Sequence, residues 1–190
     1  MARMMVGMGE IGVMHPANRG IVTALWTVGA SPCIILGIQK GSTALLAHIH
    51  RANNLYTVME QVGKILGDAF PKEATARAFI ATETFTGTAT NDAKVQSVMI
   101  TFLEQQLQKL GIRLIEKNMS KSAACIAYEG YQLSDGIAFN LSPSEIQGLS
   151  DWTEAYDKRF QGLTGELPMA IRVGINNEDP KVAVSRMYPK

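Results

Sequence analysis

Residues 21–49 read IVTALWTVGASPCIILGIQKGSTALLAHI, which contains three apolar runs separated by short breaks. Apolar runs of this length that are bounded by Gly, Pro and Ser are typical of β-strands. We predict strands over 21–27, 33–39 and 43–49. Lys40-Gly41-Ser42 is expected to form a tight turn, because glycine adopts a positive φ at no steric cost. With connections this short, the three strands are predicted to lie side by side as a meander.

Two later segments carry a helical period instead. The first begins at Asn53 and ends near Gly67, and its apolar stripe consists of Leu55, Val58, Met59, Val62, Ile65 and Leu66. The second is capped by Thr90 or Asn91 and ends at Gly111, and its apolar face consists of Val95, Val98, Met99, Phe102, Leu103, Leu107 and Leu110. Apolar residues spaced by three and four positions predict amphipathic helices packed on a core.

Shorter apolar runs predict more strands, over 78–81, 112–115, 124–128 and 136–139, with a polar loop over 82–90. We expect an α/β fold of the α+β type, in which a layered mixed β-sheet or sandwich core carries the two main helices. Residues 1–140 are predicted to form this domain, and 141–190 a C-terminal extension packed on it. The extension is predicted to contain helices starting at Ser142-Pro143 and over 151–160, and strands over 169–174 and 181–185.

The composition is that of a globular chain with little net charge. Of the 190 residues, 46% are hydrophobic and 18% are charged, which allows a buried core. The 18 basic and 17 acidic residues leave a net charge of +1, which gives no long-range attraction to phosphate backbones or anionic lipid. We therefore expect no nucleic-acid partner. No run approaches the roughly 20 apolar residues of a membrane span, so membrane insertion is not expected either.

The cysteine content favours a reducing compartment. Cys33 and Cys125 are too few for a disulfide scaffold. The opening sequence MARMMVGMGEIGV is interrupted by glycines and by Glu10, so it lacks the unbroken apolar centre of a signal peptide. We expect a cytoplasmic protein, and a secreted effector without a cleavable signal fits the same sequence.

Cys33, His48 and Thr27 carry the minimum set of side chains for a cysteine nucleophile with its base and an orienting group. Thr27 lies six residues before Cys33, and His48 lies fifteen residues after it. In such a site the thiol is the nucleophile, the imidazole its base and a hydroxyl the group that orients the ring. The small residues Gly29-Ala30-Ser31 leave room for a substrate and backbone N–H groups for an oxyanion. Because a free thiol has a pKa of about 8.5, we expect His48 to hold Cys33 as thiolate at neutral pH.

Each of these residues also has an ordinary structural explanation. A cysteine in an apolar strand is most often part of the core, and threonine is a common strand residue. His48 is preferred over His50 as the base, because Ala47-His48-Ile49 still belongs to the predicted strand while His50 begins its exit. Cys125 has no histidine or second cysteine close to it in the sequence and is interpreted as a core residue.

No metal site and no cofactor are expected. The cysteines and histidines show no Cys-x-x-Cys or His-x-x-x-His spacing, which are the usual patterns of metal ligands. The glycines of Gly7-Met8-Gly9-Glu10-Ile11-Gly12 match neither nucleotide-binding fingerprint at the required spacing.

A further pattern spans the first 50 residues and consists of Val6-Gly7-Met8-Gly9-Glu10-Ile11, Ile21-Val22-Thr23, Gly29-Ala30-Ser31-Pro32-Cys33 and Ala47-His48. It resembles the start of the CheD chemoreceptor glutamine deamidases, and a weaker likeness continues to about residue 140. The resemblance implies a CheD-like fold and a Cys-His-Thr triad. In this chain Cys33 would be the nucleophile, His48 the base and Thr27 the group that orients His48. A similar triad occurs in bacterial deamidating toxins related to CheD by fold.

The chain departs from the family at three places. Pro32 stands where the family has serine, which removes one backbone N–H near the site. Met119-Ser120-Lys121-Ser122-Ala123-Ala124 replaces a Gly-Gly segment with a following arginine. The interval from Cys33 to His48 is about two residues shorter than in the family. The first difference concerns the oxyanion site, the second the recognition of receptor helices, and the third fits a tighter Lys40-Gly41 hairpin.

The resemblance implies a protein-glutamine deamidase, a hydrolase that converts a carboxamide to a carboxylate and releases ammonia. The expected partner is a protein that carries the target glutamine. It is either a chemoreceptor of the same bacterium or a foreign protein modified by an effector or toxin. The alternative is a catalytically inactive CheD-like protein-binding module, for which Pro32 is the main indication.

Overall fold

The computed structural model describes residues 2–14, 22–51, 53–69, 75–84, 90–135, 165–167 and 170–174. Within them the helices are α1 (Leu55–Ala69) and α2 (Thr90–Lys109). The strands are β1 (Ala2–Met5), β2 (Glu10–Met14), β3 (Val22–Thr27), β4 (Ile34–Lys40), β5 (Thr43–Ile49), β6 (Arg77–Ala81), β7 (Arg113–Asn118), β8 (Ala123–Ala127), β9 (Gly130–Ser134), β10 (Gly165–Leu167) and β11 (Ala170–Gly174). They form a larger sheet of order β10-β11-β2-β5-β4-β6-β7 and a smaller sheet of order β1-β3-β8-β9.

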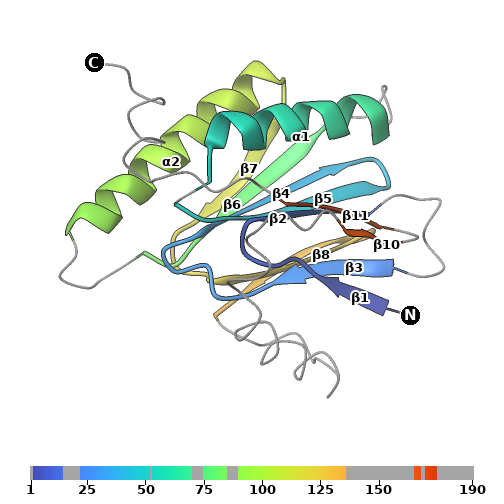
Figure 1. Ribbon diagram of the computed structural model, residues 1–190, viewed down its shortest axis with the longest axis horizontal. Coiled ribbons are helices and arrows are strands. Elements are labelled where there is room, and N and C mark those ends of the chain that lie inside the picture. Colours follow the sequence, from blue (N-terminus) through green and yellow to red (C-terminus); the bar gives the residue numbers. More distant parts are fainter. Residues whose placement is uncertain are drawn as a thin grey trace.

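The helices, the larger sheet and the smaller sheet form three layers (Figure 1). α1 and α2 cover one face of the larger sheet, where Val58 and Leu103 of the helices share a core with Ile38 of β4. The opposite face packs on the smaller sheet, around residues such as Ile35 and Leu25. Both sheets are mixed, because β1 and β3 run parallel, as do β6 and β7, while the other pairs are antiparallel. The prediction of a mixed α+β fold with two helices on a layered sheet core is confirmed at this level.

The predicted meander of three neighbouring strands is wrong. β4 and β5 form an antiparallel hairpin, but β3 lies in the smaller sheet between β1 and β8. The connection over 28–33 therefore carries the chain from one sheet to the other, as happens at the corners of packed sheets. As a result, Thr27 and Cys33 belong to two facing layers and not to adjacent strands.

Local signals in the sequence match the observed ends of the elements. The β4–β5 turn is tight, with Gly41 at a φ of 59° and Lys40 paired with Thr43. Asn54 caps α1, since its Oδ1 accepts hydrogen bonds from the backbone N–H groups of Tyr56 and Thr57 at 3.0 and 3.3 Å. Gly111 follows α2 at a φ of 68°, as expected at a helix C-terminus. In the described part of the chain, neither helix combines the length and the apolar character needed to cross a membrane.

Several strands were not anticipated. β1 and β2 occupy the opening segment, where β1 pairs with β3 and β2 pairs with β5. β9 was also missed, and the predicted strand over 136–139 lies outside the described residues, as do the predicted helices after Ser142 and the strand over 181–185. β11 matches the predicted strand over 169–174 and lies between β2 and the edge strand β10 of the larger sheet.

Candidate active site

Thr27, Cys33 and His48 lie between the two sheets. Thr27 is the last residue of β3 in the smaller sheet, His48 lies in β5 of the larger sheet, and Cys33 immediately precedes β4. All three are almost inaccessible to solvent, with exposed fractions of 1% for Thr27, 2% for Cys33 and 0% for His48. The site is therefore closed to solvent in this structure.

The contacts of Thr27 determine the tautomer of His48. Thr27 Oγ1 lies 2.7 Å from the backbone carbonyl oxygen of Val6 and 2.7 Å from His48 Nδ1. A carbonyl oxygen only accepts, so the single hydroxyl proton of Thr27 is donated to Val6. His48 Nδ1 must then carry a proton and donate it to Thr27 Oγ1. We infer that the lone pair of the neutral ring lies on Nε2, the nitrogen a general base would use.

Strand register places Cys33 on the same side of the sheet as His48. His48 is paired with Ile35 across the β4–β5 hairpin, and Cys33 lies two residues before Ile35. Paired residues share a face of a sheet, and so do residues two apart in one strand. Cys33 also packs in the same cluster as Ile35, between the sheets. If the hairpin register is continued one residue past Ile34, Cys33 and His48 become diagonal neighbours, a relation in which Cα atoms lie about 7–8 Å apart and longer side chains can meet.

The thiol is covered by the turn between β1 and β2. Cys33 Sγ lies 3.1 Å from the thioether sulfur of Met8, which is half-buried. Two hydrogen bonds hold this turn in place. Gly9 donates its N–H to the His48 carbonyl at 2.7 Å, and Gly7 donates its N–H to the buried Glu10 carboxylate at 2.7 Å. Glu10 is also the residue paired with His48 on β2. The sequence pattern alone indicates no role for Met8 or Glu10.

Burial keeps the side chains of Cys33 and His48 neutral. It raises the pKa of the Cys33 thiol to about 12, an effect that the nearby Arg51 guanidinium only partly offsets. Burial also lowers the pKa of His48 to about 3, with a smaller contribution from His50. The closed site therefore holds a neutral thiol beside a neutral imidazole, and the expectation of a thiolate held by His48 at neutral pH does not describe this arrangement.

The low pKa of His48 makes folding stability depend on pH. An unfolded histidine gains a proton near pH 6.5, whereas buried His48 stays neutral down to about pH 3. Protonation below pH 6.5 thus favours the unfolded chain. We expect the free energy of unfolding to fall with decreasing pH, by up to about 1.4 kcal/mol per pH unit from this group, until pH approaches the folded value. Urea unfolding at pH 7, 6, 5 and 4 measures it.

The His48→Gln variant is the control for this pH dependence. Other titrating groups contribute equally to both proteins, so the difference in unfolding free energy between wild type and variant should shrink as pH falls from 7 to 4. A difference that stays constant over this range would contradict the low pKa of His48.

Met8 is predicted to limit the access of reagents to Cys33. Met8→Ala removes the side chain that contacts the sulfur, so iodoacetamide should alkylate Cys33 at least about tenfold faster at pH 8, since a thiol needs both exposure and ionisation to react. Peptide mass spectrometry measures this rate. Met119→Ala is the matched control, because half-buried Met119 packs on the helix side of the larger sheet. Equal Cys33 rates in both variants would show that Met8 does not protect the thiol.

Backbone N–H groups before Cys33 are already engaged. Ala30 donates its N–H to the Ser122 carbonyl at 2.9 Å, and Ser31 donates its N–H to the Gly29 carbonyl at 2.9 Å. Pro32 has no N–H. The expectation that Gly29-Ala30-Ser31 leaves donors for an oxyanion is therefore wrong for Ala30 and Ser31 in this arrangement.

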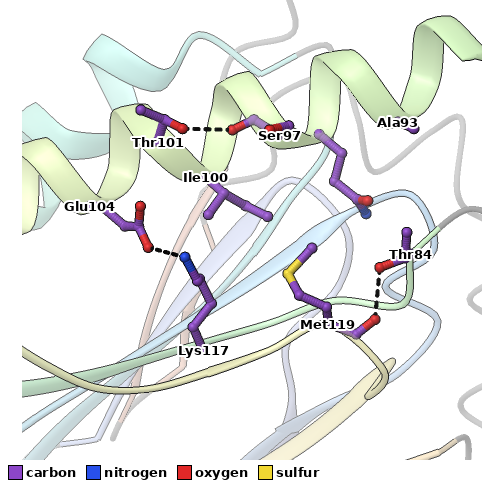
Figure 2. A pocket seen from close by; sticks show the side chains of 9 residues that line it. Thr84, Ala93, Ser97, Ile100, Thr101, Glu104, Lys117 and Met119 are labelled. Carbon is purple, nitrogen blue, oxygen red and sulfur yellow. Dashed lines mark hydrogen bonds and ion pairs between the residues drawn. The ribbon is translucent and has the colours of Figure 1, made fainter.

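A cavity of about 290 Å³ lies elsewhere, between α2 and β7. Figure 2 shows Glu104 of α2 reaching to Lys117 of β7, with an ion pair of 2.7 Å, and Ile100 and Met119 beside them. None of Thr27, Cys33 and His48 lines this cavity. Gln96, which also lines the cavity, connects it to the turn before Cys33, because its Nε2 lies 3.3 Å from the Pro32 carbonyl oxygen.

Comparisons with known proteins add no assignment. No protein-family model matches the chain, and a search of curated proteins finds no match.

Proposed function

We propose that this protein is a cysteine-dependent amide hydrolase whose reacting groups are Cys33, His48 and Thr27. The observation that carries the proposal is the hydrogen bond between Thr27 Oγ1 and His48 Nδ1, which joins the two sheets beside Cys33. This bond favours the ring tautomer in which Nε2 accepts a proton. A buried threonine and histidine in this relation form the orienting half of a triad.

Within that class, the proposed activity is the deamidation of a glutamine side chain in a protein, as the resemblance to CheD implies. Cys33 Sγ attacks the carboxamide carbon while the thiol proton passes to His48 Nε2. His48 then gives the proton to the departing nitrogen, ammonia leaves and a thioester remains. Water attacks the thioester carbon and gives a proton to His48. That proton returns to sulfur as the carboxylic acid is released.

The neutral resting pair suits this mechanism once the site opens. A glutamine side chain must displace Met8 to reach the sulfur, because the two sulfur atoms are in contact. Attack and proton transfer then occur together, since neither a thiolate nor an imidazolium is present beforehand. Substrate binding and displacement of the Met8 side chain thus occur in one step.

The test is a search for the substrate by mass. A lysate treated with the wild-type protein should contain a peptide whose glutamine has gained about one dalton, the change from amide to acid. The same lysate treated with Cys33→Ser should lack it. A chemoreceptor peptide would indicate action inside the same cell, whereas a peptide of a foreign protein would indicate an effector. If no peptide gains this mass in a Cys33-dependent way, the deamidation proposal is contradicted.

A catalytically inactive binding module is the second candidate. The observation that favours it is that residues 30–32 offer no free donor, since Pro32 lacks an N–H and those of Ala30 and Ser31 are engaged. Loss of one oxyanion donor typically lowers the rate by about 100-fold to 1000-fold. An inactive module should still bind a protein, with the same affinity in wild type and Cys33→Ser, and release no ammonia.

A further inference from the structure

Two buried polar side chains outside the triad hold the turn that carries Cys33. Thr82 follows β6 and is fully buried, and its hydroxyl lies 2.6 Å from the Cys33 carbonyl oxygen and 3.2 Å from that of Ala30. Gln96 of α2 is 2% exposed, and its Nε2 lies 3.3 Å from the Pro32 carbonyl oxygen. These two side chains therefore contact the carbonyl groups of Ala30, Pro32 and Cys33.

Gln96 also sets the direction of the Thr82 hydrogen bond. Gln96 Nε2 lies 2.6 Å from Thr82 Oγ1 and, as an amide nitrogen, can only donate to it. The hydroxyl proton of Thr82 is then directed to a carbonyl oxygen, and the Cys33 carbonyl is the nearest. The result is a directed chain from Gln96 through Thr82 to the backbone of Cys33.

The backbone of Thr82 is itself fixed. Its N–H donates to the Asn118 carbonyl at 3.0 Å, and its carbonyl accepts from Lys121 at 3.2 Å. Glu83 donates its N–H to the Ala30 carbonyl at 3.0 Å. These backbone hydrogen bonds hold Thr82 in place even if the turn that carries Cys33 moves. The Thr82 hydroxyl therefore restrains the position of that turn.

We propose that Thr82 and Gln96 are positioning residues that hold the Cys33 sulfur between the sheets, facing His48. The proposal rests on the proposed function, because it assigns the two residues to the nucleophile of that reaction. Burying a hydroxyl and an amide at a helix–sheet interface is unfavourable unless they are hydrogen-bonded. Here their partners are the residues around the nucleophile.

The test measures the reactivity of Cys33 as a function of pH. Thr82→Val keeps the side-chain shape and removes the hydroxyl, so the turn loosens and the sulfur gains access to water. Iodoacetamide should then alkylate Cys33 about tenfold faster at pH 8, the effect of one lost hydrogen bond. The midpoint of the pH profile should move down from about 12. Thr82→Ser restores the hydroxyl and should behave as wild type.

Two comparisons separate this role from general destabilisation. Cys125 in the same protein is the internal reference, and its alkylation rate should not change. Thr101→Val is the matched variant, because Thr101 is exposed and its hydroxyl donates to the Ser97 carbonyl within α2. Gln96→Met should reproduce Thr82→Val, and it decides the question if Thr82→Val does not fold.

The outcomes also separate this proposal from the proposed function. Unchanged Cys33 rates in both variants, or equal acceleration of Cys33 and Cys125, would overturn the positioning role. If the contrast holds but the wild-type protein releases no ammonia from any substrate, Thr82 and Gln96 still position the thiol. In that case only the deamidase proposal fails.

Discussion

Cys33→Ala is expected to eliminate ammonia release while the protein remains folded. In the proposed mechanism the sulfur forms the thioester and neither His48 nor Thr27 can replace it, so the rate should fall by on the order of 10⁴-fold or more. The substitution removes one buried sulfur atom from the core between the sheets. We expect it to lower the free energy of unfolding by about 1 kcal/mol. Activity is measured as ammonia release from the substrate that mass spectrometry identifies. Stability is measured by urea unfolding.

Cys125→Ala is the matched control for the cysteine. Cys125 lies in β8 of the smaller sheet and is partly exposed. It should be dispensable for turnover, so this variant should release ammonia at the wild-type rate. Cys33→Ala with undiminished release, or an equal loss in both variants, would contradict the assignment of Cys33 as nucleophile.

Much of the fold was predictable where the signal is local. The stripe of α1 begins after the cap at Asn54, and Gly111 follows α2 with the positive φ that such a position favours. The β4–β5 hairpin follows from two apolar runs and a short glycine turn. Each of these features depends on residues within a few positions of one another, so the sequence pattern contains them.

The assignment of strands to sheets was not predictable in the same way. The run over 21–27 is as apolar as its neighbours, and nothing in it distinguishes pairing with β4 from pairing with β1 and β8. The pairing of β3 depends on β1 and on β8, which lies about a hundred residues later. β1 was hard to predict because glycines interrupt the opening segment. Strand pairing over such distances is decided by packing, and a single sequence does not record it.

The candidate site shows the same division. The intervals between Thr27, Cys33 and His48 show only that these residues are close along the chain, and Thr27 meets His48 across two sheets instead of within one. Spacing did not reveal that Met8 covers the thiol or that Gln96 reaches the Pro32 carbonyl. These contacts join residues 25 and 64 positions apart.

Thr27→Val is expected to reduce deamidation roughly 10²-fold to 10⁴-fold, because the imidazole loses the acceptor that fixes its tautomer. Valine has nearly the shape of threonine, so the ring keeps its space while Nδ1–H loses its partner. The Val6 carbonyl loses its donor in the same step. Each of these two unsatisfied buried groups lowers the free energy of unfolding by about 1–3 kcal/mol. The rate should therefore fall far more than stability alone explains.

Thr27→Ser distinguishes orientation from packing. Serine keeps the hydroxyl and loses the methyl group, so it should recover most of the rate even if it is less stable than wild type. The ¹⁵N shifts of the imidazole provide the direct readout: wild type and Thr27→Ser should carry the proton on Nδ1, and Thr27→Val should show a mixture or the other tautomer. If Thr27→Val keeps both the Nδ1 proton and the wild-type rate, Thr27 does not orient the base. His48 would then be held by the sheet alone, and the hydrogen bond between the two sheets would be structural.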